Sequence, residues 1–554
     1  MSLRAVPVRS EGAGWTTHER GSWRWHVAPG WVEHLLNADG LRLEEWQRTG
    51  QAVVVKSGLH RTVYRVQLGC GEVYVKHCPL HDLRAQVRQK LRPSKARTEA
   101  ELANRLIELG IPTITPLAVG ETAAGESCLV TAALSNAATL KDFVEAGRSG
   151  IATRFELARG LAELLAAMHD AGVGHGDLHA GNILVTMEAA SLHFHLIDLH
   201  AVRLGSPLDW PASRDNLVLL NRWFVQRSTR ADRLRFWKQY LRYRRRLGVR
   251  NPDCHKLARE LERRTWASCL AFWRKRDGRC TGENRYFYRA AGGRCQAHAV
   301  RGVPLAVVQD LLRDPDEPFA KPIRMLKHSR SSTVAEIELL IDGRLRRCIW
   351  KRFAVTKWSD PLVHLIRSTP GLRSWVGGHR LLECGMPTPR PLVVLQRFRH
   401  GLPHECYLLT EVLADAVDLH SFWVSLATPT ERRELVERAA RLIRDLHRRG
   451  LAHRDLKAAN VLVGADGELS LIDLVGLERS SSLSKKQRVR NLARLHASFH
   501  DDPRLSKADK LRFLRVYLSW GLFGKEGWKA WWQAIAEATA RKINRNRRRG
   551  RPLT

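Results

Sequence analysis

Two eight-residue stretches decide how this sequence folds: HGDLHAGN at residues 175–182 and HRDLKAAN at residues 453–460. They lie within longer matching segments, LLAAMHDAGVGHGDLHAGNILV and LIRDLHRRGLAHRDLKAANVLV, which align without a gap. The separation between Asp177 and Asp455 therefore equals that between Asn182 and Asn460. The chain repeats itself once, and a repeat of this length predicts two similar domains.

The catalytic chemistry is predicted by the second of these stretches. HRDLKAAN agrees with the protein-kinase catalytic-loop pattern HRDLxxxN at every fixed position. In that chemistry an aspartate accepts the proton of the acceptor hydroxyl, and an asparagine five residues later binds a metal ion on the nucleotide phosphates. Asp177 and Asp455 are accordingly the predicted catalytic bases. An aspartate after an apolar strand, in HLIDLH and in LSLIDLVG, completes each metal site. The predicted magnesium ligands are Asn182, Asp198, Asn460 and Asp473.

The predicted ATP contacts begin with a lysine at the end of an apolar strand in each half, Lys76 in VYVKHC and Lys351 in CIWKRF. Such a lysine neutralises the nucleotide phosphates and is held by a carboxylate from a helix. Glu99 is the expected partner of Lys76, with Glu101 as the alternative on the same helix. Ser374 occupies the aligned position in the second half, which therefore lacks this partner, so the first half is expected to carry most of the activity. The full set of predicted ATP contacts is Lys76, Glu99, Lys351 and Lys457.

The order of elements in each half predicts the fold class. Strand-like segments such as QAVVVKSG, RTVYRVQLG and GEVYVKHC come first, a helix leads into GIPT or GMPT, further strands follow, and the remainder has helical periodicity. This order predicts an α+β chain of two tandem, two-lobed, protein-kinase-like domains, each with a small antiparallel β-rich N-lobe and a mainly helical C-lobe. The expected limits are residues 22–280 and 284–540, followed by a basic tail at 541–554.

Several features argue against an ordinary protein kinase. Neither half contains the glycine-rich GxGxxG pattern; the corresponding turns read SGLHRT and HSRSST. Gly176 replaces the arginine of the HRD pattern, and no APE motif follows. The short stretch between Asp198 and Asn216 leaves little room for a segment that would dock a peptide.

The net charge of +36 is the unusual feature of the composition. Basic residues concentrate at 84–97, 242–246 and 541–551. Self-repulsion on this scale favours an anionic partner, but no nucleic-acid-binding motif is present, so nucleic acid is not the expected partner. The 10 cysteines are scattered and indicate reduced thiols rather than a disulfide or zinc framework. No signal peptide and no apolar run of about 18 residues is found, which predicts a cytoplasmic protein.

The combination of GIPTITPLAVGE or GMPTPRPL with HGDLHAGNIL and with IDLH or IDLVG resembles the lipopolysaccharide core-sugar kinases of the Kdo/WaaP family. The resemblance covers both halves. It implies ATP and Mg²⁺, and phosphorylation of a hydroxyl on Kdo or heptose of the lipid A core at the cytoplasmic membrane face. A basic surface is compatible with an anionic glycolipid acceptor and with peripheral contact with an anionic membrane.

Two other interpretations remain open. A Ser/Thr protein kinase is favoured by HRDLK in the second half. A kinase and pseudokinase pair, with a nucleotide-binding regulatory second domain, is favoured by Ser374.

Overall fold

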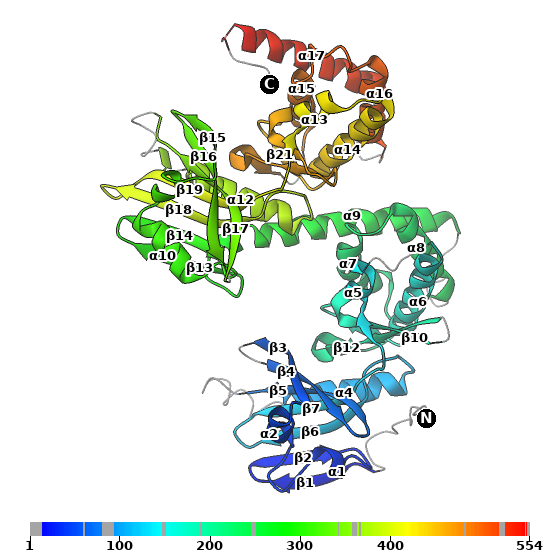
Figure 1. Ribbon diagram of the computed structural model, residues 1–554. Coiled ribbons are helices and arrows are strands. Elements are labelled where there is room, and N and C mark those ends of the chain that lie inside the picture. The colour runs from blue at the N-terminus through cyan, green and yellow to red at the C-terminus, as the bar shows by residue number, and fades with distance from the viewer. Residues whose placement is uncertain are drawn as a thin grey trace. The chain divides into compact units, whose positions relative to one another are not determined.

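The computed structural model describes residues 14–58, 61–79, 93–146, 151–188, 191–244, 251–341, 343–356, 363–364, 367–480, 483–519, 527–548 and 550 (Figure 1). Most of the basic stretch at 84–97, parts of those at 242–246 and 541–551, and the middle of the SGLHRT turn lie outside these residues.

The chain divides into two compact units, Met1–Ser268 and Cys269–Thr554. The division falls within helix α9 (Asn251–Arg276). The domain limits expected from the repeat differ from this division, since they would place residues 269–280 in the first domain. These expected limits stay a proposal. The stretch expected as a tail from residue 541 begins inside helix α17 (Trp528–Arg547).

The N-lobe of the first unit is a seven-stranded antiparallel sheet in the order β1-β2-β6-β7-β5-β4-β3. In β5, Val73 and Val75 are buried in the core, and Lys76 follows with the opposite orientation, as the two-residue period of a strand requires. The strands are β1 (Thr16–Arg20), β2 (Trp23–Val27), β3 (Ala52–Gly58), β4 (Arg61–Leu68), β5 (Gly71–Cys78), β6 (Pro116–Thr122) and β7 (Ser127–Ala132). The helices are α1 (Val32–Leu35), α2 (Leu43–Arg48) and α4 (Lys95–Glu108).

Helix α4 begins at an N-cap serine, since Ser94 Oγ accepts the Arg97 N–H at 3.1 Å. Three alanines on one face of this helix, Ala96, Ala100 and Ala103, are buried. The first two pack with Val119 and Leu129 of β6 and β7. The small side chains let α4 lie close to the sheet, which places the carboxylate of Glu99 on the same side as the strands.

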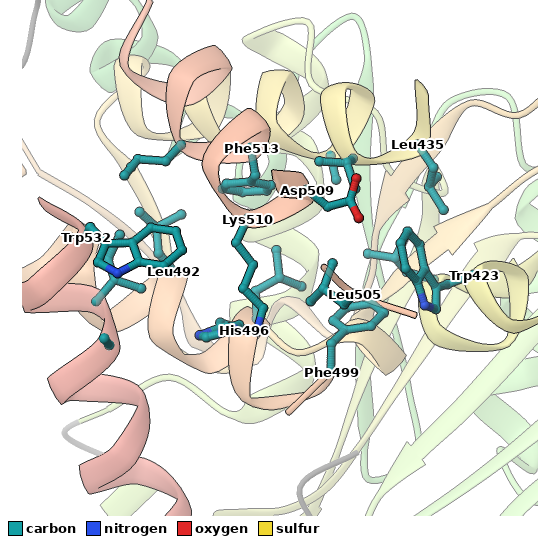
Figure 2. A pocket seen from close by; sticks show the side chains of 17 residues that line it. Trp423, Leu435, Leu492, His496, Phe499, Leu505, Asp509, Lys510, Phe513 and Trp532 are labelled. Carbon is teal, nitrogen blue, oxygen red and sulfur yellow. The ribbon is translucent and has the colours of Figure 1, made fainter. Parts of the chain in front are cut away.

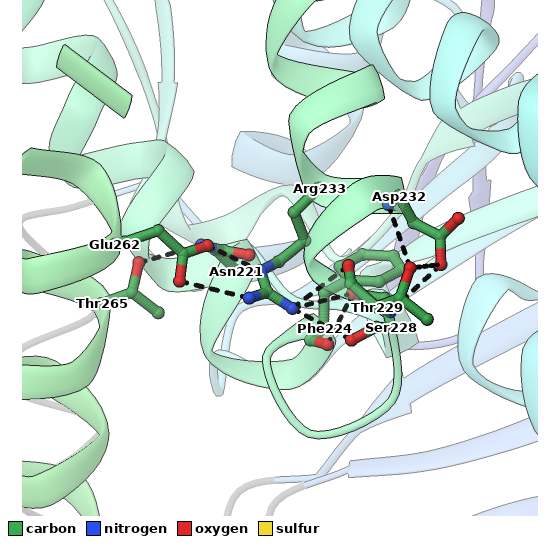
Figure 3. A network of polar contacts seen from close by, with 8 residues as sticks. All are labelled: Asn221, Phe224, Ser228, Thr229, Asp232, Arg233, Glu262 and Thr265. Carbon is green, nitrogen blue, oxygen red and sulfur yellow. Dashed lines mark hydrogen bonds and ion pairs between the residues drawn. The ribbon is translucent and has the colours of Figure 1, made fainter. Parts of the chain in front are cut away.

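The C-lobe of the first unit is helical apart from short strands around the catalytic loop. Figure 3 shows how the buried Arg233 joins two of its helices: the guanidinium binds Glu262 of α9 at 2.6 and 3.2 Å and donates to the Ser228 carbonyl at 3.0 Å. The helices are α5 (Leu140–Glu145), α6 (Ile151–Asp170), α7 (Trp210–Phe224), α8 (Arg230–Tyr243) and α9. The strands are β8 (Ala138–Thr139), β9 (Val173–His175), β10 (Ile183–Glu188), β11 (Ser191–Leu196) and β12 (Val202–Leu204), with 3₁₀ turns η1 (Ala180–Asn182) and η2 (Leu199–Ala201).

The N-lobe of the second unit repeats this plan with the sheet order β13-β14-β18-β19-β17-β16-β15. Its strands are β13 (Phe287–Gly292), β14 (Cys295–Val300), β15 (Arg324–Ser329), β16 (Ser332–Ile341), β17 (Arg344–Phe353), β18 (Pro391–Arg399) and β19 (Leu402–Glu411). Its helices are α10 (Leu305–Arg313) and α12 (Pro370–Glu383), with 3₁₀ turns η4 (Arg279–Thr281) and η5 (Glu317–Phe319). Helix α12 corresponds to α4 and carries Ser374 at the place of Glu99.

The C-lobe of the second unit packs its helices around an apolar cavity of about 130 Å³, shown in Figure 2. Trp423, Phe499 and Phe513 are among its lining side chains. The helices are α13 (Leu419–Ser425), α14 (Pro429–Arg448), α15 (Lys485–Ala497), α16 (Lys507–Leu518) and α17. The strands are β20 (Val417–Asp418), β21 (Leu451–His453), β22 (Val461–Val463), β23 (Leu469–Leu471) and β24 (Leu477–Arg479), with 3₁₀ turns η6 (Ala458–Asn460) and η7 (Leu474–Gly476).

The predicted α+β class, with a β-rich lobe followed by a helical lobe in each of two copies, is confirmed. In the part of the chain that the structure describes, none of the helices combines the length and apolar character that crossing a membrane would need.

Candidate active sites

The GIPT and GMPT segments tie the two lobes of each unit together. Buried Thr113 donates its hydroxyl to the Leu196 carbonyl at 2.7 Å, and the Leu196 N–H donates to the Pro112 carbonyl at 2.9 Å. The second unit repeats both bonds, at 2.7 and 3.0 Å, with Thr388, Leu471 and Pro387. The strand that ends just before each predicted metal aspartate is thus fixed to the base of the N-lobe.

The catalytic loop of the first unit is held by hydrogen bonds that leave the Asp177 carboxylate exposed. The Asp177 N–H donates to His175 Nδ1 at 3.2 Å, and the His175 N–H donates to Asn216 Oδ1 of α7 at 2.8 Å. Asn182 Nδ2 donates to the Asp177 carbonyl at 3.0 Å. Burial lowers the pKa of His175, so this histidine is a neutral structural member of the loop rather than a base.

The catalytic loop of the second unit has the same geometry. The Asp455 N–H donates to His453 Nδ1 at 3.2 Å, and the His453 N–H donates to Asn491 Oδ1 of α15 at 3.0 Å. Asn460 Nδ2 donates to the Asp455 carbonyl at 2.8 Å. Both loops are therefore built to present an exposed aspartate.

The predicted metal ligands of each unit come from two segments that lie side by side. The Ile197 N–H donates to the Asn182 carbonyl at 3.0 Å, which brings Asp198 next to Asn182. In the second unit the Ile472 N–H and the Asn460 carbonyl make the same bond, also at 3.0 Å. Asp198 and Asp473 both have left-handed backbone conformations, with φ of 60° and 56°. A non-glycine residue pays roughly 1–3 kcal/mol for this, and such strain is concentrated at functional sites.

These residues fit a magnesium ion. Mg²⁺ takes oxygen ligands and is commonly held by one or two carboxylates together with substrate phosphates. Because Asn182 uses its amide nitrogen for the Asp177 carbonyl, its Oδ1 is the atom that remains for a metal. Within the described residues no group of three or more His, Cys, Asp or Glu side chains is placed to hold a metal. Each site would thus offer one carboxylate and one amide oxygen, with phosphates supplying the rest.

The two units differ in how the predicted ATP-binding lysine is held. Lys76 contacts Glu99 of α4, and both side chains are largely buried. In the second unit Lys351 Nζ instead binds Asp473 Oδ1 at 2.9 Å. Ser374 is buried there, and its hydroxyl has no hydrogen-bond partner among the described residues. The lysine without a helix carboxylate thus pairs with the predicted metal ligand.

The model of the lipopolysaccharide kinase (Kdo/WaaP) family matches residues 44–240 and 360–517, which together make up more than half of the chain. The chain belongs to the Kdo/WaaP family. Each match contains one catalytic loop and the following aspartate, so the prediction of two family copies is confirmed, and the family is one of kinases. The second match begins after β17, so Lys351 lies outside it.

Individual relatives are similar over parts of their length. The lipopolysaccharide core heptose(I) kinase WaaP of Pseudomonas aeruginosa is 33% identical over 180 residues, which are 30% of this chain and 67% of that protein. The 3-deoxy-D-manno-octulosonic acid kinase of Haemophilus influenzae is 32% identical over 125 residues, 22% of this chain and 51% of the relative. A solved structure of WaaP in complex with acyl carrier protein is 24% identical, with a TM-score of 0.29, and the match covers 40% of this chain and 91% of the chain in that structure. The chain thus spans about half to two thirds of these curated relatives.

In the first unit of this Kdo/WaaP family member, Arg61 of β4 reaches across to the predicted metal aspartate. Its Nη1 lies 3.0 Å from Asp198 Oδ1. Burial alone would raise the pKa of Asp198, but the hydrogen bond and charge of Arg61, aided by Lys76, outweigh burial and lower this pKa. The pair therefore stabilises the folded state at neutral pH and loses that contribution as the pH falls through the folded pKa. In the second unit Lys351 has the same effect, since its charge and hydrogen bond outweigh burial and lower the pKa of Asp473.

Arg61→Ala should lower the Mg²⁺ concentration that gives half-maximal activity, because Arg61 and the metal would use the same carboxylate. A partly exposed ion pair is worth at most about 1 kcal/mol, so the expected change is about fivefold. The measurement is a Mg²⁺ titration of phosphate transfer at saturating ATP. Arg65→Ala is the matched control, since Arg65 lies on the same strand and pairs with Glu72 at 3.1 Å. A raised KM for ATP with an unchanged Mg²⁺ requirement would show that Arg61 binds nucleotide instead.

Sequence reasoning missed His179, which follows Asp177 by two residues. His179 Nδ1 accepts the Gly181 N–H at 3.0 Å, so Nε2 carries the ring proton of the neutral form and lies 3.7 Å from Asp177 Oδ2. A Cβ at position 181 would lie 3.1 Å from the ring, which explains the glycine. The second unit has Lys457 and Ala459 at these two positions. The paired change from HAG to KAA was visible in the sequence and could have revealed the residue. The expected role of Lys457 as an ATP contact stays a prediction.

Proposed function

We propose that this chain is an ATP-dependent kinase that transfers phosphate to a sugar hydroxyl of the lipopolysaccharide core or of a related envelope glycolipid. The chain belongs to a family of lipopolysaccharide kinases. The observation that carries the proposal is the arrangement of the predicted site residues in its first unit. There the Lys76–Glu99 pair accompanies a loop that presents Asp177 beside Asn182 and Asp198.

In the proposed mechanism Asp177 accepts the proton of the sugar hydroxyl as it attacks the terminal phosphate of ATP. Lys76, oriented by Glu99, balances charge on the phosphates, and its enclosed position strengthens that interaction. The Asn182 amide oxygen and the Asp198 carboxylate would hold magnesium. When bound, magnesium neutralises negative charge on the phosphate oxygens.

The proposed acceptor is anionic. Two similar proteins are named as kinases of heptose(I) in the lipopolysaccharide core and of 3-deoxy-D-manno-octulosonic acid. The net charge of +36 suits an acceptor that carries phosphates and lies on an anionic bilayer. We therefore propose that the protein works at the cytoplasmic face of the membrane, by peripheral contact.

The test is transfer of labelled phosphate from ATP, with Mg²⁺, to lipopolysaccharide extract by the wild type and by Asp177→Ala/Asp455→Ala. Label should appear on glycolipid with the wild type and be absent with the double variant. Wild-type protein that labels no glycolipid acceptor would refute the proposal. Label on protein instead, lost in Asp455→Ala, would support the Ser/Thr protein kinase interpretation.

A second candidate function concerns the second unit alone, which we propose binds nucleotide and regulates the first unit. It is favoured by Ser374 at the position of the helix carboxylate and by the Lys351–Asp473 pair. A lysine bound to the predicted metal ligand opposes metal-assisted transfer, and it can still bind nucleotide phosphates by exchanging Asp473 for them.

Lys76→Met should therefore retain one nucleotide site for each chain while transferring phosphate at no more than roughly 1% of the wild-type rate, the loss expected for a phosphate-binding lysine. Lys76→Met/Lys351→Met should bind no nucleotide. Equilibrium binding of an ATP analogue and the transfer assay measure the two quantities separately. Transfer by Lys76→Met near the wild-type rate would show instead that the second unit is an active kinase.

A further inference from the structure

A hollow of about 720 Å³ lies in the N-lobe of the second unit, away from the predicted nucleotide site. It is bounded by the β13–β14 hairpin, the C-terminal end of α10 and the β18–β19 hairpin. In the sheet order, β19 separates β18 from β17, the strand that carries Lys351. Its volume is within the range of small-molecule pockets.

The hollow is strongly basic. Arg294, Arg313, Arg397, Arg399 and His404 line it, and Glu405 is the one acidic residue among its lining side chains. Arg397 already uses that acid, since it binds Glu405 at 2.9 Å and Asp316 at 2.8 Å. In the described part of the chain neither Arg294 nor Arg399 forms an ion pair, and both are exposed. Positive charge without a protein partner therefore faces this hollow.

The first unit provides an internal comparison, because its sheet has the same strand order without these arginines. The pair Trp23 and Thr122, on β2 and β6 of the first unit, is equivalent to the pair Cys295 and Arg397, on β14 and β18 of the second. The residue just before β2 is Ser22, and the residue just before β14 is Arg294. Two residues after Thr122 the first unit has Ala124, and two residues after Arg397 the second unit has Arg399.

The preceding hairpin turns are equivalent as well, with left-handed glycines at Gly21 and Gly293 (φ of 54° and 57°). The residue before the shared glutamate, Glu126 or Glu405, is Gly125 in the first unit and His404 in the second. The first unit forms the same strand order with uncharged residues at these positions, so the strand order does not require Arg294, Arg399 or His404.

We propose that this hollow binds a phosphate group carried on a saccharide. Guanidinium groups match phosphate oxygens with paired hydrogen bonds, and several of them around one hollow select a multiply charged anion over a neutral sugar. Only the saccharide part of this inference rests on the proposed function. The anion site is inferred from the geometry of the hollow. The same chemistry could come from a soluble sugar phosphate or from a phosphorylated headgroup on a membrane.

The test compares wild type with Arg294→Ser/Arg399→Ala, which installs the residues of the first unit. Arg344→Ser/Arg433→Ala is the control, since it removes the same charge from two exposed arginines outside the hollow. Calorimetric titration with glucose 1-phosphate is done with an ATP analogue saturating the nucleotide sites, and glucose is the uncharged probe. Wild type and control should bind glucose 1-phosphate equally, the hollow variant at least about tenfold more weakly, and glucose should not bind.

A second arm uses vesicles of phosphatidylcholine with or without phosphatidic acid. Binding to the phosphatidic acid vesicles alone, lost in the hollow variant and kept in the control, would support the anion site and identify a membrane headgroup as the source, but it would overturn the saccharide, because phosphatidic acid carries no sugar. Equal binding of both probes by the hollow variant and the wild type would overturn the proposal, and so would an equal loss in the control. Neither arm depends on turnover, so failure of the kinase proposal would leave these results readable.

Discussion

Asp177→Asn should lower kcat for phosphate transfer by roughly 10²- to 10⁴-fold, the contribution of a general base, while the KM for ATP changes little. The loop should survive the substitution, because it is built from the backbone N–H and carbonyl of residue 177, which bind His175 and Asn182. Only the proton-accepting oxygen is lost. Among the described residues the exposed carboxylate accepts no hydrogen bond, and His179 Nε2 comes only to within 3.7 Å of its Oδ2. Little stability therefore depends on it.

Asp455→Asn is the matched control for this prediction. It is the same change in a loop of the same geometry, but its unit has Lys351 bound to Asp473 and lacks a helix carboxylate. We expect the variant to keep most of the wild-type rate. Equal losses in the two variants would mean that both units transfer phosphate, and full activity in Asp177→Asn would contradict the assignment of the base. Unchanged melting temperatures would show that both variants are folded.

The fold could be predicted because local and repeated signals agree. The strand period in GEVYVKHC, the strand-to-helix order and the gap-free alignment of the two catalytic loops all indicate the same two-lobed unit. The first half opens with the aromatic segment WRWHV and the second with YFYR, but these are not equivalent strands: WRWHV forms β2 and pairs with β6, whereas YFYR leads into the edge strand β13, which pairs with β14. The equivalent of β2 is β14, which pairs with β18, and this could not be predicted because strand neighbours far apart in sequence leave no local signal.

The candidate site could be predicted only where roles follow from position in the chain. Asp177, Asn182 and Asp198 follow from motif spacing, and the missing carboxylate at Ser374 follows from alignment. What Lys351 does without that carboxylate could not be predicted, since its contact with Asp473 depends on how closely the two lobes approach. The contact between Arg61 and Asp198 is of the same kind. Neither contact has a pattern of its own in the sequence.

Gly172→Ala should destabilise the first unit by roughly 3–5 kcal/mol, at the upper end for a single substitution. Gly172 lies in the turn between α6 and β9, just before the catalytic loop, and has a left-handed φ of 75°. A Cβ there would lie 2.0 Å from the Gly205 carbonyl oxygen, and the Gly205 N–H donates to the Gly172 carbonyl at 3.0 Å. The backbone segments before β9 and after β12 are therefore pressed together at this point. Side-chain adjustment cannot relieve a clash between two backbones.

Gly110→Ala separates this close approach from the cost of the backbone conformation. Gly110 has a similar φ of 70°, but a Cβ there would meet nothing within 4 Å. It should cost only the roughly 1–2 kcal/mol of a left-handed alanine. Gly450 of the second unit repeats the geometry of Gly172, with φ of 69° and a Cβ 2.3 Å from the Ser480 carbonyl oxygen, so Gly450→Ala should match Gly172→Ala. Thermal unfolding of the three variants measures the difference. Equal costs for Gly110→Ala and Gly172→Ala would mean that the turn before the catalytic loop can open, and the loop would then owe its position to Asn216 rather than to this contact.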